Sequence, residues 1–123
     1  MIYFLELSPT SLSTDESVTE EISPKDDRPP DFLQPIKGMS VQSGDTALFE
    51  CKVEGIPKPQ LYWYFNNRKI RSSRFVQISE DKDSAKLQIK NIKPFDSGKY
   101  TIRAINRAGV KSSTATLTVK GMI

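Results

Sequence analysis

Few residues of this chain have side chains that could do covalent or metal chemistry. The 123 residues include no histidine and one cysteine, Cys51. The commonest general base is therefore missing, and so are the clustered Cys, His or carboxylate ligands of a zinc site. Serine, threonine, lysine and aspartate have no base-orienting partner, and no Gly-rich phosphate loop occurs. The sequence predicts a protein that is not an enzyme and holds no cofactor or metal.

Cys51 is open to two interpretations, a redox sensor or a buried and inert thiol. It stands in the alternating run Thr46–Val53, on the same side as Ala47 and Phe49, and this strand position favours the inert thiol. A single cysteine cannot close a disulfide within the chain. Either the compartment is reducing or the fold does not need the bond.

The first seven residues, Met1–Leu7, are apolar but lack the marks of a targeting segment. Glu6 interrupts the run and no Lys or Arg precedes it, whereas a signal peptide has a basic start and about 7–15 apolar residues. No stretch approaches the ~20 apolar residues of a membrane span. We therefore expect a cytoplasmic protein without a membrane span.

Charge divides the chain into two parts. Residues 1–28 hold seven acids and two bases, a net charge of −5, and residues 29–123 hold the other 8 acids and 16 bases, a net charge of +8. The first part is also rich in Ser and Pro and poor in apolar residues, so it cannot offset its ordering entropy. We predict a disordered acidic leader or linker over 1–29 and one folded domain over 30–120. The leader could fold back on the basic domain.

Short alternating runs separated by turn residues dominate the chain from residue 30 onward, and no helical period exceeds two turns. Such runs predict about eight strands in two antiparallel sheets packed face to face, an all-β sandwich. The expected strands are Asp31–Ile36 and Gly38–Val41 (one edge strand split at Pro35 and Gly38), Thr46–Val53, Leu61–Phe65, Phe75–Ser79, Ala85–Ile89, Lys99–Ile105 and Val110–Lys120, with a short edge around Lys69-Ile70.

Motifs within these strands resemble the intermediate set (I-set) of immunoglobulin domains, of the titin, twitchin, palladin and myosin light chain kinase type. The resemblance covers residues 30–120. It rests on Cys51 in Leu48-Phe49-Glu50-Cys51, on Trp63 twelve residues later, on the loop Glu54-Gly55-x-Pro57-x-Pro59, and on the spaced block Leu87, Ile89, Ile92, Asp96, Gly98, Tyr100, Ala104, Asn106 and Gly109. It implies an immunoglobulin-like Greek-key sandwich.

The resemblance gives each motif residue a structural role. Trp63 would fill the space between the sheets with one N–H to satisfy, and Tyr100 would form a tyrosine corner by bonding back to the backbone. The resemblance also implies that Asp96 pairs with Arg74 and that Gly98 and Gly109 need positive φ. The core residues singled out are Cys51, Trp63, Leu87, Asp96, Gly98, Tyr100 and Ile102.

Ile102 stands where the family's second cysteine should lie, two residues after Tyr100. Closing the loop from Cys51 to that position would contribute roughly 4 kcal/mol in the chain-entropy model, and this domain does without it. We expect Ile102 and the Cys51 thiol to pack against Trp63 instead. Intracellular members of the family often lack the bond, so the resemblance favours an intracellular domain.

Basic residues on outward positions could form a surface for an acidic partner. The set singled out comprises Arg68, Lys69, Arg71, Lys86, Lys90, Lys99 and Arg103. The resemblance implies actin as a partner. The alternative interpretation is that the lysines protect sheet edges from aggregation. Nucleic acid is not expected, since exposed aromatic residues for base stacking are limited to Tyr62 and Tyr64.

Two functions are consistent with these observations. The first is a structural and interaction module of a muscle or cytoskeletal scaffold, which binds actin or myosin filaments and lies beside further immunoglobulin or fibronectin domains. The alternative is an extracellular adhesion or receptor immunoglobulin domain. The missing disulfide, the missing signal peptide and the Ser/Pro/acid linker favour the first.

Overall fold

The computed structural model describes residues 26–121, and the prediction of a disordered leader falls mostly outside this range. Within it the chain forms nine strands and one short 3-10 turn, η3 (Pro94–Asp96). The strands are β2 (Arg28–Gln34), β3 (Met39–Gln42), β4 (Ala47–Ile56), β5 (Gln60–Phe65), β6 (Arg68–Lys69), β7 (Val76–Glu80), β8 (Ser84–Ile89), β9 (Gly98–Asn106) and β10 (Gly109–Lys120).

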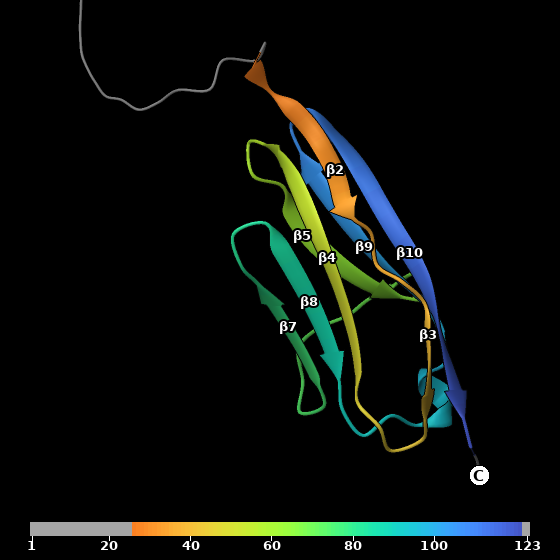
Figure 1. The fold of residues 1–123 in the computed structure, drawn as a ribbon. Helices are drawn as coiled ribbons and strands as arrows, with labels where there is room; N and C mark the ends of the chain where they lie inside the picture. The colour runs from red at the N-terminus through yellow and green to blue at the C-terminus, as the bar shows by residue number, and fades with distance from the viewer. Residues whose placement is uncertain (1–25, 122–123) are drawn as a thin grey trace, which may run out of the picture.

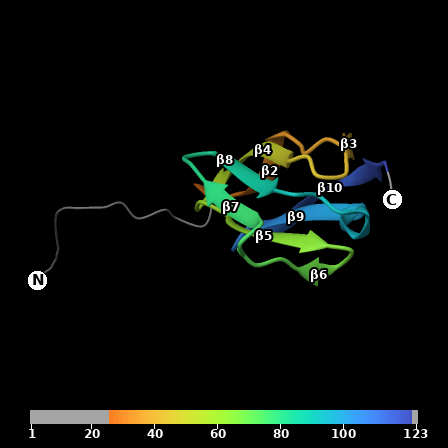
Figure 2. The same ribbon diagram turned by 90° about the horizontal axis from the view of Figure 1, so that it is seen from below.

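The strands form two sheets that lie face to face (Figures 1 and 2). One sheet has four strands in the order β2-β4-β8-β7, and the other has five in the order β3-β10-β9-β5-β6. All neighbouring pairs are antiparallel except β3 and β10, which run parallel. The prediction of an all-β immunoglobulin-like sandwich is confirmed.

The predicted split edge strand divides between the two sheets. β2 pairs with β4, and β3 pairs with β10 in the other sheet. Pro35 lies in the connection and cannot donate to a ladder, while a Cβ on Gly38 would lie 2.9 Å from the carbonyl oxygen of Thr116. The chain therefore changes sheet where Pro35 and Gly38 were expected to interrupt the strand.

The core lies between the sheets and follows the period-2 pattern of the strands. In β4 the inward residues Ala47, Phe49, Cys51 and Val53 alternate with exposed ones. From the other sheet comes Tyr100, whose ring centroid lies 5.0 Å from that of Phe49. At about 25 cal/mol per Å² of apolar surface, this burial is the main favourable term of folding.

Positive backbone φ angles occur at the turns that need them. Asn66 and Asn67, with φ of 48° and 72°, form the two-residue connection between β5 and β6, which is the conformation of a type I′ hairpin. Gly98 has φ 153°, and a Cβ there would lie 2.8 Å from Phe65 Cε1. The expectation for Gly109 is wrong, because its φ is not positive. Its constraint is space, since a Cβ would lie 3.1 Å from Pro29 Cβ.

Candidate protein-binding surface

The described part of the chain offers no constellation for metal chemistry. No group of three or more His, Cys, Asp or Glu side chains within residues 26–121 could hold a metal ion. Burial raises the pKa of the Cys51 thiol to about 11, so the reactive thiolate is scarce at neutral pH. Nor does any helix among these residues have the length and apolar character to cross a bilayer.

Five of the seven predicted core residues are buried between the sheets, whereas Asp96 in η3 and Gly98 at the start of β9 are only half-buried. The five buried residues are Cys51, Trp63, Leu87, Tyr100 and Ile102. Trp63 on β5 stands directly opposite Ile102 on β9, and both belong to one apolar cluster with Cys51. The indole N–H of Trp63 has no hydrogen-bond partner within residues 26–121. Trp63 therefore stabilises the fold by its apolar volume.

A tyrosine corner closes the turn before β9. The Tyr100 hydroxyl donates to the carbonyl oxygen of Asp96 over 2.8 Å. Burial, with the nearby Asp96 charge as a smaller cause, raises the pKa of Tyr100 above its ordinary value. The Asp96 carboxylate accepts a hydrogen bond from the backbone N–H of Lys93 at 2.8 Å. Asp96 therefore accepts one hydrogen bond through its side chain and one through its backbone carbonyl.

The expected pair between Asp96 and Arg74 is wrong. No ion pair among residues 26–121 joins them. The Arg74 guanidinium instead lies over the Phe75 ring, 5.5 Å from its centroid. The physical reason is local, because the Asp96 carboxylate is held by the Lys93 N–H three residues earlier.

Removing the Tyr100 hydroxyl tests the corner. We expect Tyr100→Phe to lower the free energy of unfolding by about 0.5–1.5 kcal/mol, because one part-buried intramolecular hydrogen bond is lost. Urea unfolding followed by Trp63 fluorescence measures the change. Thr101→Val, which removes a hydroxyl from an exposed hydrogen bond to Thr114, is the control and should cost less. Equal losses would contradict the assignment.

The predicted basic set does not form one surface. Lys86 lies on β8 of the four-stranded sheet, where its Nζ is 3.5 Å from Glu50 Oε2, and Lys90 directly follows β8. Lys99 and Arg103 lie on β9 of the five-stranded sheet. Around its β6 edge lie Arg68, Lys69 and Arg71. The seven residues are divided between opposite sides of the sandwich.

The outer side of the five-stranded sheet combines cations with aromatic rings. Strand register places Tyr62 opposite Arg103, and Lys69 Nζ lies 4.7 Å from the centroid of the Tyr62 ring. A shallow hollow beside them is lined by Tyr64, Asn67, Thr101, Arg103, Val110 and Ser112. We call Tyr62, Tyr64, Lys69, Arg103 and Val110 the aromatic–cationic face.

Sequence reasoning missed three members of this face. Tyr62 and Tyr64 were considered only for nucleic acid, and Val110 was not singled out although it is 55% exposed. The alternation of β5 does place both tyrosines outward. Which cation they meet depends on the register between β5 and β9, for which the sequence holds no local signal.

An ion pair joins Asp27, which precedes β2, to Arg107 in the turn between β9 and β10. The Asp27 carboxylate accepts two hydrogen bonds from the Arg107 guanidinium, at 2.7 and 2.9 Å. Its hydrogen bond to Arg107 lowers the pKa of Asp27. Asn106 Nδ2 also donates to the carbonyl oxygen of Arg28, at 2.8 Å. The β9–β10 turn thus holds the start of β2.

Comparison with known families agrees with this architecture and with the spacing of its motifs. The family model described as the immunoglobulin I-set domain matches residues 30–119. The chain belongs to the immunoglobulin I-set family. Its buried Trp63, its tyrosine corner and its free Cys51 are therefore features of a member of this family.

Several known proteins are similar to this I-set chain. The muscle M-line assembly protein unc-89 of Caenorhabditis elegans is 42% identical over 84% of this chain and 1% of its own length. Telokin of Meleagris gallopavo is 34% identical over 94% of this chain and 80% of its own length. Vascular endothelial growth factor receptor 1 of Gallus gallus is 31% identical over 85% of this chain and 8% of its own. The chain spans a small fraction of the two longer relatives.

Solved structures give the same result for the fold. The titin domains z1z2, solved in complex with telethonin, superpose with a TM-score of 0.76 and 32% identity, covering 97% of this chain and 53% of that chain. The relatives that are muscle proteins support a structural module, and the titin complex is an example of immunoglobulin domains engaged with a protein partner.

Proposed function

We propose that this I-set chain is a non-enzymatic interaction module of an intracellular muscle or cytoskeletal scaffold, which binds an acidic filament surface such as actin or myosin. We also propose the division into a leader over 1–29 and a domain over 30–120, with further immunoglobulin or fibronectin domains as neighbours. The observation that carries the proposal is the aromatic–cationic face. Tyr62 and Arg103 lie side by side there on rigid strands, and such strands position side chains better than loops do.

The chemistry of this face suits an acidic protein. Tyrosine and arginine are enriched at the binding centres of interfaces, because rings supply contact area and guanidinium groups supply charged hydrogen bonds. The net charge of +8 over residues 29–123 would increase the rate of encounter with an acidic filament. The similarity to unc-89 and to telokin supports a muscle setting.

Charge reversal on the face tests the proposal. In cosedimentation with actin and with myosin filaments over a salt series, we expect Arg103→Glu to weaken binding about tenfold at low salt, equivalent to ~1.4 kcal/mol. Lys90→Glu makes the same charge change beside the four-stranded sheet and is the matched control, with affinity near that of the unmodified chain. If both variants weakened binding equally, net charge alone would determine the affinity for the filament. If neither actin nor myosin filaments bound the chain at low salt, the filament proposal would be wrong.

The alternative, an extracellular receptor or adhesion domain, is supported by the similarity to vascular endothelial growth factor receptor 1. The two proposals differ in where the protein is found. An antibody against the domain should stain muscle cells only after permeabilisation if the scaffold proposal is right. Staining of intact cells would favour the receptor.

A further inference from the structure

Strand β4 has an open edge where β2 leaves it. On one side, β8 pairs with β4 over Ala47–Lys52. On the other side, β2 pairs with β4 from Ile56 only as far as Lys52, because the chain then crosses to the five-stranded sheet. Residues 47–51 of β4, which we call the open edge, therefore have a strand neighbour on one side only.

The register identifies the backbone groups that face this open side. The Val53 N–H donates to the carbonyl oxygen of Asp83 over 2.8 Å, in the same register as the β4–β8 ladder. In an antiparallel ladder, hydrogen-bonded pairs alternate with non-bonded pairs. Ala47, Phe49 and Cys51 thus bond to β8, whereas the N–H and C=O groups of Leu48 and Glu50 point toward the open side.

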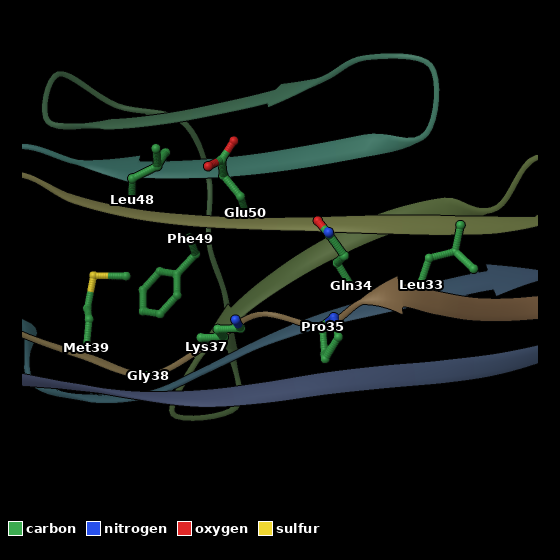
Figure 3. Close-up of a pocket in the computed structure, with 9 residues that line it drawn as sticks. All are labelled: Leu33, Gln34, Pro35, Lys37, Gly38, Met39, Leu48, Phe49 and Glu50. Atoms are coloured by element: carbon green, nitrogen blue, oxygen red, sulfur yellow. The ribbon is translucent and has the colours of Figure 1, made fainter.

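A groove of about 450 Å³, lined by both apolar and polar side chains, adjoins the open edge. Figure 3 shows Phe49 and Met39 on the same side of the β4 ribbon, with Leu48 and Glu50 on the other. Leu33 and Leu48, which also line the groove, are 53% and 40% exposed. The groove therefore presents apolar side chains next to unpaired backbone groups, the two features that an added strand would use.

Charge defines what kind of strand fits. The Glu50 carboxylate points to the side of β4 away from Phe49 and lies 3.5 Å from Lys86 Nζ. Lys37 lines the groove and is exposed, and no ion pair joins it to any residue of the 26–121 range. A second copy of this domain carries a net charge of +8 over residues 29–123 and would be repelled overall, whereas an acidic segment would be attracted to Lys37.

We propose that the open edge docks an extended acidic segment of a partner protein, which adds as an antiparallel strand beside residues 47–51. Both existing neighbours of β4 are antiparallel, and the added strand continues the line of β2. Its alternate apolar side chains enter the groove beside Phe49 and Met39, and a carboxylate meets Lys37. The site lies apart from the aromatic–cationic face and does not rest on the proposed function.

A short synthetic peptide tests the geometry of this pairing. The probe is a blocked hexapeptide, Thr-Val-Thr-Tyr-Thr-Asp, which places Val, Tyr and Asp on one face. In the antiparallel arrangement, residues opposite Leu48 and Glu50 point outward, so the threonine N–H groups are the ones that bond to β4. We expect N-methylation of the threonines to weaken binding to the full chain at least about tenfold, and N-methylation of Val and Tyr to change it little. Equal effects of the two patterns would overturn the proposal.

The charge contact is tested by exchange. Lys37→Glu should weaken binding of the probe that ends in aspartate about fivefold. A probe that ends in lysine should bind this variant without that loss. Amide chemical shifts of Leu48 and Glu50 report whether each probe binds at the open edge. A loss of binding that the lysine probe does not recover, or shifts confined to the other sheet, would contradict the site. Because Lys37 is exposed, the variant is expected to fold.

Rival occupants give distinct results in the free protein. We expect the Leu48 and Glu50 amides to exchange rapidly without the probe. Protection that is lost in Leu5→Asp would assign the edge to the chain's own residues 1–7, and protection that rises with protein concentration would assign it to a second copy. Either result would overturn the partner proposal while leaving the filament experiment with Arg103→Glu unaffected.

Discussion

Trp63→Ala is expected to lower the free energy of unfolding by about 3–5 kcal/mol, a large part of the ~5–15 kcal/mol that stabilises a typical domain. Trp63 is 2% exposed and lies opposite Ile102, which is fully buried. Cys51 is free, so no disulfide joins the sheets in this chain. No covalent bond would therefore hold the two sheets together once the Trp63 contacts are lost. Urea unfolding by circular dichroism measures the change.

Trp63→Phe separates volume from hydrogen bonding at the same position. The indole N–H makes no hydrogen bond within the described residues, so phenylalanine loses volume but also removes an unsatisfied donor. We expect a loss well below that of the alanine variant. If phenylalanine and alanine destabilised the domain equally, an unseen partner of the indole would have to be stabilising it.

Ile102→Cys is expected to make the domain responsive to oxidation. If the new thiol reaches Cys51, the oxidised variant should be more stable than its reduced form by up to ~4 kcal/mol, because the crosslink restricts the unfolded chain. In the reduced variant the isoleucine volume is missing from a fully buried position, and stability should fall below that of the unmodified chain. Urea unfolding with and without a reductant, with thiol titration, measures both effects.

The double variant Cys51→Ala with Ile102→Cys is the control for this experiment. It keeps the new thiol but removes its partner, so oxidation should leave its stability unchanged. Slow oxidation is expected, since burial raises the pKa of Cys51 to about 11 and thiolate is the reacting form. If two free thiols persisted after unfolding and refolding in oxidant, residues 51 and 102 would not lie close enough to form a disulfide.

Local pattern predicts much of this fold. The alternation over Thr46–Val53 fixes both the β4 strand and its inward side, because side chains of a strand alternate between faces. The paired asparagines before Arg68 predict their turn for the same kind of reason, since asparagine tolerates positive φ. In these segments, the residues that decide the conformation are adjacent in the chain.

Long-range pairing decides what the sequence left open. Pro35 and Gly38 mark a break, yet only tertiary contacts place β3 parallel to β10 in the other sheet. In the same way, the outward position of Lys86 was predictable, but the division of the basic residues between two sheets was not. The Asp96–Arg74 pair failed for the opposite reason, because a local backbone N–H binds the carboxylate.

The parallel pairing of β3 with β10 has a mechanical consequence. Met39–Gln42 lie beside Leu117–Lys120, and the described chain begins and ends at opposite ends of the sandwich (Figure 1). Tension applied at Arg28 and Lys120 would pull β3 and β10 in opposite directions along their common axis. Their hydrogen bonds would then be loaded together in shear, so the rupture of this short ladder is a concerted event that resists stretching.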